Sequence, residues 1–332
     1  MAKFLQHIVL LLLIMAVLYP LLLWQGEKAH LSANVAYTRG NYSHLLRRGQ
    51  DVRHYDSVDV LFIGSSRCYR SFDTRYYAEQ GITTFNLGSS NQTPVQTLAL
   101  LRGYLDSLHP RCVVMEVNPD VMGDDGVEGG MDLVSNLPVS LPIAAMMLCN
   151  GDPYSLNMLA LAMEKHWKNK DFGDSDSLIP VNPEGTLFFA YIPGGFVESS
   201  PHHWTPTPQP ATDVRMLDKQ LKAVSQCQRL CRKKGIPLLL TEVPCSNAKY
   251  TCYGNHDVFA KAMRNINADY VDCNTMEIFD NMEDSIHFYD VDHLNREGVA
   301  FFSPHFLYHV LLPFLKHTTR RTRPANLTIT TS

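Results

Sequence analysis

The feature that most constrains the fold is an alternation of short apolar runs with a helical segment. Residues 58–63, 82–87 and 112–117 are apolar runs of strand length, and a loop rich in Gly, Ser or Asn follows each of them. Between the second and third runs, residues 94–107 carry apolar side chains at helical spacing. This order predicts right-handed strand–helix–strand crossovers and therefore an α/β fold with a parallel sheet.

The same alternation returns in the C-terminal part of the chain. Residues 212–234 have a helical pattern, and residues 236–243 and 270–272 are strand-like. The apolar segment 299–315 is predicted to be a helix that packs on the sheet. Residues 121–211, rich in Met, Pro and Gly, interrupt the alternation, and we interpret them as an insertion that covers the site or shapes its specificity.

The N-terminus predicts a membrane-spanning helix. Residues 4–24 follow Lys3 and contain no charge, and roughly 20 apolar residues suffice to cross a bilayer. A cleaved signal peptide has a similar start. However, the apolar run is long for a signal peptide and no clean small-x-small cleavage site follows it, so we favour a retained anchor. The predicted organisation is an anchor (1–27), a spacer (28–56) with a possible helix near residues 42–48, a catalytic domain (57–316) with the insertion at about 121–211, and a disordered basic and Thr-rich tail (317–332).

Charge and cysteine content exclude some classes of function. A net charge of −4 without a basic stripe argues against a nucleic-acid-binding protein. The eight cysteines lack paired CxxC spacing, so the sequence predicts no zinc site and no other metal site. Cys245 and Cys252 flank a short polar loop and are a candidate disulfide if the domain is exported.

The candidate nucleophile is Ser66, just after the first predicted strand. In open α/β sheets, ligands bind outside the carboxyl ends of the strands. A serine nucleophile needs a base and a group that orients this base. Asp290 and His293, three residues apart, have a spacing that lets the carboxylate accept from the imidazole while its other nitrogen faces the serine. The alternatives are that Asp290 only caps a helix with His293 on the surface, that Asp292 orients the histidine, and that Cys68 is the nucleophile.

An oxyanion formed during acyl transfer needs preorganised donors. Gly88, at the end of the second predicted strand, permits close backbone approach and is a candidate together with the Ser66 N–H. Asn118, at the end of the third, is a candidate amide donor.

Three motifs carry a resemblance to the SGNH/GDSL hydrolase superfamily: Gly64-Ser65-Ser66, Asn86-Leu87-Gly88, and Asp290-x-x-His293-Leu294-Asn295 with Gly298. The resemblance covers roughly residues 57–120 and 236–315. It is closest to a membrane-anchored branch of bacterial envelopes that includes D-alanyl transfer and alginate O-acetyltransferase type proteins. Two departures matter: the usual Gly-Asp-Ser is Gly-Ser-Ser here, and residues 116–119 replace the Gly-x-Asn-Asp block. The second departure weakens the case for Asn118, so Asn91 is an alternative donor and Arg67 a further substrate-binding candidate.

The resemblance implies a flavodoxin-like three-layer α/β/α fold with a central parallel sheet. It also implies an acyl-serine mechanism through Ser66, His293 and Asp290 without a cofactor. By the same resemblance, the protein is an acyltransferase on the outer side of a bacterial cytoplasmic membrane. It would act on an envelope polysaccharide or acyl-ester substrate, with a small acyl group and a multi-spanning membrane acyltransferase as partner. The alternatives are a plain esterase or lipase, a catalytically degenerate accessory protein of such an acyltransferase, and an unrelated anchored binding module.

Overall fold

The centre of the molecule is a five-stranded parallel sheet. The computed structural model describes residues 1–28, 40, 43–168, 189–200 and 205–322. The strands lie in the order β2-β1-β3-β6-β7 and pair in parallel throughout. Their bounds are β1 (Val60–Ile63), β2 (Thr84–Asn86), β3 (Cys112–Glu116), β6 (Leu238–Glu242) and β7 (Tyr270–Asp272). Counted along the chain, this is the order 2-1-3-4-5 of flavodoxin-like sheets. The predicted α/β fold class is confirmed.

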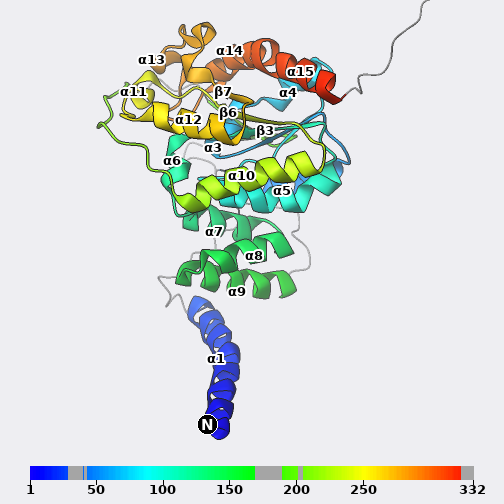
Figure 1. Cartoon of the computed structure of the whole chain (residues 1–332), viewed down its shortest axis with the longest axis vertical. Helices are drawn as coiled ribbons and strands as arrows, with labels where there is room; N and C mark the ends of the chain where they lie inside the picture. The colour runs from blue at the N-terminus through cyan, green and yellow to red at the C-terminus, as the bar shows by residue number, and fades with distance from the viewer. Residues whose placement is uncertain (29–39, 41–42, 169–188, 201–204, 323–332) are drawn as a thin grey trace, which may run out of the picture.

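Successive side chains along each strand point to opposite faces of the sheet and pack into two separate hydrophobic cores. In β1, Leu61 faces one core and Phe62 the other. The first core contains side chains from α5 (Pro94–Leu108), α10 (Asp218–Lys233) and α12 (His256–Ile266). The second contains side chains from α3 (Ser66–Ser71), α14 (Arg296–Phe306), the π-helical η5 (Leu307–Leu311) and α15 (Leu312–Thr322), with α4 (Thr74–Glu79) on the same face. Helices therefore cover both faces of the sheet (Figure 1).

Two helices predicted in the C-terminal part of the chain are present, and the first of them begins later than predicted. The helix expected over 212–234 begins at Asp218, because the preceding residues are extended: Thr212 forms a bridge with Tyr253. The segment expected over 299–315 is helical and contributes Phe302 and Phe306 to the core, as predicted. Although Arg296–Thr318 is long and apolar enough to cross a membrane, half of its most apolar window is buried.

The predicted tail starts later than expected. Helix α15 continues to Thr322, past the boundary predicted at residue 317. The Thr318 side chain is buried, and its hydroxyl donates to the carbonyl of Phe314. The remaining tail, 323–332, lies outside the described residues.

The predicted insertion is folded over the described part of its length. It forms α6 (Pro119–Gly123), α7 (Val127–Asn136), α8 (Leu141–Asn150), α9 (Pro153–Lys168) and the antiparallel hairpin of β4 (Phe189–Ile192) and β5 (Phe196–Ser199). Helices α7, α8 and α9 form a further layer beyond α5, on the side of α1 (Figure 1). Residues 169–188 and 201–204 lie outside the described part. The β4–β5 hairpin packs against α3, which starts with Ser66.

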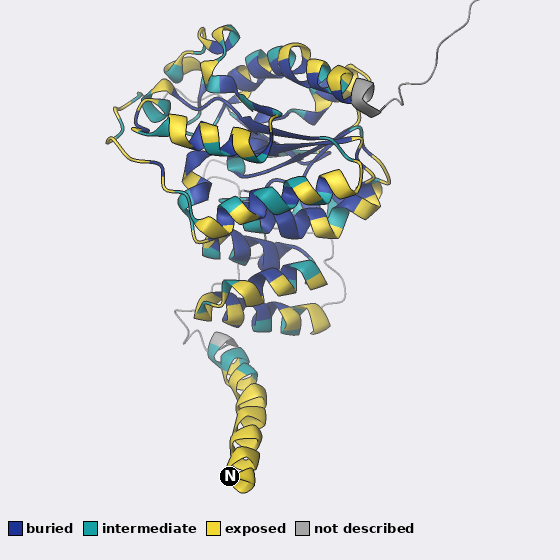
Figure 2. Cartoon of the chain, in the orientation of Figure 1, coloured by how far each residue is buried: buried dark blue, intermediate teal, exposed yellow. Residues whose placement is uncertain are grey.

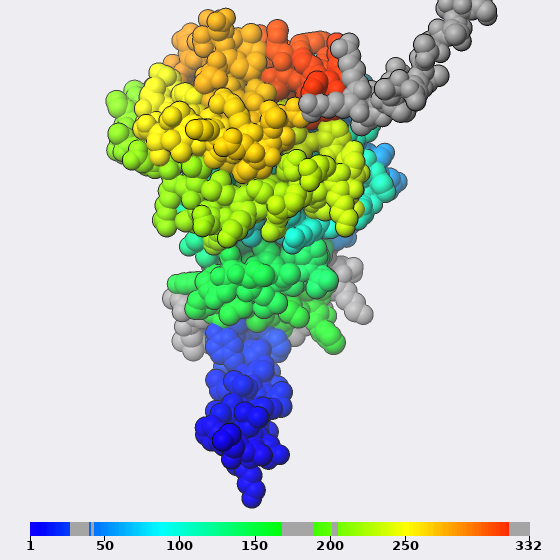
Figure 3. All heavy atoms as spheres, viewed as in Figure 1, coloured from blue at the N-terminus to red at the C-terminus, as the bar shows by residue number. Residues whose placement is uncertain are grey.

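Helix α1 (Ala2–Lys28) projects from the rest of the molecule (Figure 1, Figure 3). Its segment Ala2–Gly26 has a mean hydropathy of 2.5, and only 6% of the most apolar window is buried. Figure 2 shows this exposure along most of the helix. The Tyr19 hydroxyl donates to the Asn157 side chain on α9. Length and composition fit a membrane anchor and a signal sequence alike.

The predicted spacer 28–56 contains a helix that belongs to the domain. Helix α2 (Leu45–Asp51), followed by η1 (Val52–His54), buries Leu45 and Arg48. Arg48 donates from Nε and Nη2 to the Gly195 carbonyl at 3.1 and 2.9 Å, and Asp51 accepts from the Gly194 N–H at 2.7 Å. These contacts clamp α2 to the turn of the β4–β5 hairpin.

The loops after β6 and β7 contain short helical segments at the carboxyl edge of the sheet. They are α11 (Asn247–Tyr250), η3 (Cys273–Thr275), η4 (Glu277–Phe279) and α13 (Asp284–His287). The loop between α13 and α14 brings residues from near the end of the chain to the edge where β1 ends.

Candidate active site

The turn after β1 positions Ser66. A Cβ added to Gly64 would lie 2.5 Å from Oε2 of Glu116, so only glycine lets this turn approach the end of β3 so closely. Oε2 of Glu116 accepts the Ser65 N–H at 2.7 Å. Ser65 is the N-cap of α3 and accepts from the Arg67 N–H at 3.2 Å. Ser66 is therefore the first residue of the helix, and it lines a cleft at the end of the strand.

The structure brings Ser66, His293 and Asp290 together. Nε2 of His293 lies 2.7 Å from Oγ of Ser66, across 227 positions of sequence. Nδ1 of His293 lies 2.8 and 2.9 Å from the two carboxylate oxygens of Asp290. Asp290 also accepts the backbone N–H of His293 at 2.9 Å, so the carboxylate fixes both the loop and the ring. The three side chains form the hydrogen-bonded chain that a serine nucleophile requires.

Residues just after this loop hold it in place. Nδ2 of Asn295 donates to the Ile286 carbonyl at 2.7 Å, and its Oδ1 caps α14 by accepting the Gly298 N–H at 3.0 Å. A Cβ at Gly298 would lie 2.0 Å from the His287 carbonyl oxygen, so the helix approaches the chain too closely for any side chain there. The Asn and Gly of the third sequence motif therefore fix the position of His293.

The protonation states suit general-base chemistry. Burial raises the pKa of Asp290, but the hydrogen bond and charge of His293 outweigh it and hold that pKa at about 2. Burial lowers the pKa of His293, the positive charge of Arg70 lowers it further, and the opposing effect of Asp290 does not cancel them. At neutral pH the carboxyl group is ionised and the imidazole is neutral and ready to accept a proton.

The cleft around Ser66 has a volume of about 330 Å³. Its lining includes His293, Arg67, Arg70, Asn91 and Asn118. It lies between the ends of β1 and β3, which is the switch point of this sheet order and the usual ligand position in open α/β folds.

Three of the predicted oxyanion donors, Gly88, Asn118 and Asn91, already donate hydrogen bonds to other residues of the protein. The Gly88 N–H donates to Oδ1 of Asn86 at 2.9 Å, because this asparagine folds back over its own turn. Nδ2 of Asn118 donates to Ser65 at 3.1 Å and to Glu116 at 2.8 Å. Asn91 donates from Nδ2 to Asp124 at 3.0 Å. Within the described residues, the Ser66 N–H is the remaining predicted donor that has no acceptor.

Arg67 and the two rival residues have other partners. Nη2 of Arg67 pairs with Asp120 at 2.9 Å and also with Asp292. Asp292 therefore neutralises an arginine, while Asp290 contacts the histidine. Cys68 is fully buried, and burial raises the pKa of its thiol well above the usual value, so it stays protonated.

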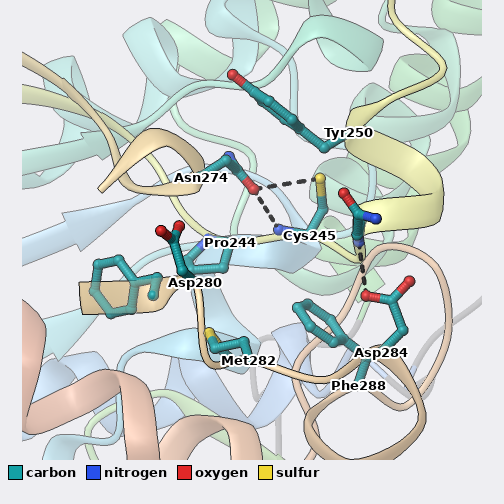
Figure 4. Close-up of a pocket in the computed structure, with 10 residues that line it drawn as sticks. Pro244, Cys245, Tyr250, Asn274, Asp280, Met282, Asp284 and Phe288 are labelled. Carbon is teal, nitrogen blue, oxygen red and sulfur yellow. Dashed lines mark hydrogen bonds between the residues drawn. The ribbon is translucent and has the colours of Figure 1, made fainter. Parts of the chain in front are cut away.

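The cysteines are all free thiols, and the candidate disulfide between Cys245 and Cys252 is not formed. Cys245 lies in a neighbouring hollow of about 360 Å³. There its N–H and Sγ both donate to Oδ1 of Asn274, at 2.9 and 3.6 Å (Figure 4). This contact, within the loops after β6 and β7, holds Cys245 in place without a disulfide.

One described group has the donor atoms for a metal ion. Ligand atoms of Glu242, His256 and Asp272 lie within 4.8 Å of one another. Nε2 of His256 is 2.9 Å from Glu242, and the Tyr250 hydroxyl donates to Asp272 at 2.9 Å. Burial raises the pKa of Glu242 to about 7, against the lowering effect of His256. The group is hydrogen-bonded internally and separate from the Ser66 cleft.

Two residues at the site were not found from sequence. Glu116 is 2% exposed and supports the Ser65 turn, and Arg70 lies in the cleft wall. Arg70 is four residues after Ser66, and this helical spacing was the signal available for it.

No protein-family model and no curated protein matches the chain. Its structure is similar to that of a protein from Bacteroides fragilis NCTC 9343 described as an acylhydrolase, with a TM-score of 0.40 and 13% identity, over 82% of this chain and 99% of that one. It is also similar to a GDSL-like lipase from Bacteroides thetaiotaomicron VPI-5482, with a TM-score of 0.39 and 12% identity, over 82% and 100%. At these TM-scores the likeness carries no conclusion about activity.

Proposed function

We propose that this protein is a serine acyltransferase or esterase of the SGNH/GDSL type that works through an acyl-serine intermediate. The observation that carries the proposal is the hydrogen-bonded chain from Ser66 through His293 to Asp290. The resemblance of three sequence motifs to the SGNH/GDSL superfamily, in which these residues match its motif positions, supports it.

The proposed reaction has two half-reactions. His293 takes the Ser66 proton as Oγ attacks the acyl carbonyl, and the same proton passes to the leaving oxygen when the tetrahedral intermediate collapses. An acceptor hydroxyl then loses its proton to His293 and attacks the acyl-serine, and His293 returns the proton to Ser66. Asp290, with its pKa near 2, stays ionised and stabilises the imidazolium. The Ser66 N–H stabilises the oxyanion.

We place the catalytic domain outside the cytoplasmic membrane of a bacterium, held by α1, and we propose an envelope polysaccharide as acyl acceptor or donor. The exposure of α1 and its contact with α9 support the anchor. Helix α9, which contacts α1, also carries exposed apolar side chains: Met163 and Trp167 are 56% and 85% exposed. The resemblance to the envelope branch supports the polysaccharide and a multi-spanning acyltransferase partner.

A probe and a transfer assay test the proposal. A fluorophosphonate should label the full-length protein and its Ser90→Ala variant, but not Ser66→Ala, because Ser90 shares the cleft but its hydroxyl contacts the Tyr69 hydroxyl, whereas Ser66 contacts His293. Incubation with an aryl acetate, with and without oligosaccharide, separates a transferase from an esterase by whether acetyl reaches the sugar. Equal aryl acetate turnover by wild type and Ser66→Ala would overturn the proposed mechanism.

A further inference from the structure

Three buried arginines lie in or beside α3, the helix that begins with Ser66, and one of them lacks a polar partner. Arg48, Arg67 and Arg70 are 0%, 4% and 8% exposed. Arg48 donates to backbone carbonyls, and Arg67 pairs with carboxylates. Among the described residues, no hydrogen bond or ion pair involves the Arg70 guanidinium, and its Nε is buried without an acceptor. Arg70 is therefore a largely buried cation that makes no direct hydrogen bond or ion pair with any described residue.

Aromatic rings hold the Arg70 guanidinium in place. Its Cζ lies 4.2 Å from the ring centre of Phe189, 5.8 Å from that of Tyr289 and 6.0 Å from that of Tyr69. Phe189 comes from the β4–β5 hairpin of the insertion, and Tyr289 directly precedes Asp290. Cation–π contacts of this kind are attractive, and more so where the cation is shielded from water. They orient the group but supply no hydrogen-bond acceptor.

The position of Arg70 connects it with the catalytic chain. It follows Ser66 by four residues in α3, so both side chains lie on one face of the helix, one turn apart. Both line the same cleft together with His293. Its positive charge also acts on the pKa values of His293 and Asp290.

A buried charge that makes no direct ion pair is unfavourable. No described carboxylate pairs directly with Arg70, and Asp290, which interacts with it through charge at longer range, is hydrogen-bonded to His293. Asp120 and Asp292 pair with Arg67, and Lys249 adds a second cation 3.1 Å from Asp120. A guanidinium presents a planar fork of donors that matches a carboxylate or phosphate. The missing partner of Arg70 is therefore an anion that enters the cleft.

We propose that Arg70 is an anion-binding residue that recognises a carboxylate or phosphate on the substrate, about one helical turn from the acyl group that reacts with Ser66. The word substrate here rests on the proposed function, whereas the anion site rests on the cleft and on Arg70 alone. On this account the insertion sets specificity by placing Phe189 against the guanidinium. The substrate class is then an acidic sugar or a phosphorylated one.

A binding experiment without turnover tests the anion site directly. Full-length Ser66→Ala protein in detergent would be titrated calorimetrically with glucuronate, glucose 1-phosphate, inorganic phosphate and glucose. We expect at least one of the two anionic sugars to bind and glucose not to bind. Which one binds distinguishes carboxylate from phosphate, and binding of inorganic phosphate alone to the same residue would assign a free-anion site.

Variants in the same background assign the binding to Arg70. Arg70→Gln should weaken it roughly tenfold or more, the loss expected for a charge-assisted contact. Arg70→Lys should retain part of it, and the exposed Arg102→Gln should retain all of it. Circular dichroism checks folding, and if Arg70→Gln fails to fold, the comparison of Arg70→Lys with Arg102→Gln decides. Equal binding of glucose and glucuronate, or unchanged binding in both Arg70 variants, would overturn the proposal.

A kinetic comparison then links the site to catalysis. On the otherwise wild-type protein, Arg70→Gln should raise KM for 4-nitrophenyl hemisuccinate by about tenfold while changing KM for 4-nitrophenyl acetate little. An equal loss of kcat on both esters, with no change in anion binding, would instead make Arg70 a positioning residue for His293. Absence of turnover on both esters, with anion binding intact, would refute the proposed catalytic function but not the anion site.

Discussion

Replacement of Glu116 by alanine should destabilise the protein and slow its reaction together. The carboxylate is 2% exposed and accepts the Ser65 N–H at 2.7 Å and Nδ2 of Asn118 at 2.8 Å. Glu116→Ala leaves the Ser65 N–H and one hydrogen of the Asn118 amide without an acceptor at a buried position, while the other amide hydrogen keeps Ser65. Each buried unsatisfied donor costs about 1–3 kcal/mol. The sum, about 2–6 kcal/mol, is a large part of the roughly 5–15 kcal/mol that keeps a typical domain folded.

The same change should displace the nucleophile. Ser65 begins the turn that sets Ser66, and its N–H is one of the two donors that Glu116 fixes. A shift of about 1 Å in a reacting group costs on the order of 10²-fold in rate. Glu116→Gln keeps the shape and one carbonyl acceptor but loses the negative charge. We therefore expect a loss of roughly 1–3 kcal/mol for Glu116→Gln, smaller than for alanine.

Urea denaturation of the full-length protein in detergent measures the free energy of unfolding, and aryl acetate hydrolysis measures kcat/KM. Glu79→Gln is the matched control, because Glu79 is exposed at the end of α4. If Glu116→Ala unfolds within about 0.5 kcal/mol of the control and retains its rate, the carboxylate does not support the turn and the reasoning fails.

Four further predictions concern the same site. Asp290→Asn should keep the fold but lower kcat by about 10⁴-fold, as the corresponding change does in another Ser-His-Asp enzyme. Stopped-flow kinetics measures kcat and circular dichroism checks the fold; a loss below tenfold would contradict the prediction. The pH profile of kcat/KM should have its acid limb below pH 6.5, since the lowered pKa of His293 keeps the base neutral to lower pH; a limb above 6.5 would contradict the burial and Arg70 effects. Cys68→Ala should retain kcat/KM within about threefold, because the thiol is buried and protonated. Inactivation of this variant would support Cys68 as the nucleophile. Gly298→Ala, with its Cβ 2.0 Å from a carbonyl oxygen, should lower the unfolding midpoint. The control is Gly103→Ala in α5, where an added Cβ meets nothing within 4 Å and the midpoint should not fall. A midpoint of Gly298→Ala equal to that of the wild type would contradict the prediction.

The sequence sufficed for the central sheet and for the residues that meet at its edge. Strand ends are visible as local patterns, and parallel crossovers place those ends together. Ser66 and the Asp290–His293 pair were therefore located without coordinates, and the structure brings them within hydrogen-bond distance. Their catalytic roles remain a prediction until the Ser66→Ala experiment is done.

The details of the cleft depend on partners that no local pattern specifies. Gly88 and Asn118 have the right residue types for oxyanion donors. However, they already donate hydrogen bonds to the side chains of Asn86 and Glu116. Helix α2 has seven residues, so the sequence indicates a possible helix near residues 42–48 but not that it packs against the hairpin turn. The missing partner of Arg70 is a property of its three-dimensional surroundings, because any arginine in the sequence looks equally available.

The clamp between α2 and the β4–β5 hairpin decides where the polypeptide can be shortened. Arg48 and Asp51 form hydrogen bonds with the hairpin turn, and Nη1 of Arg48 donates to the Ser43 carbonyl at 3.1 Å. A water-soluble version that starts after Asp51 would release the strand bearing Phe189 and deform the wall of the cleft. Genetic removal of the hydrophobic leader should therefore stop before Ser43, and proteolytic nicking on either side of this point offers a direct map of the boundary.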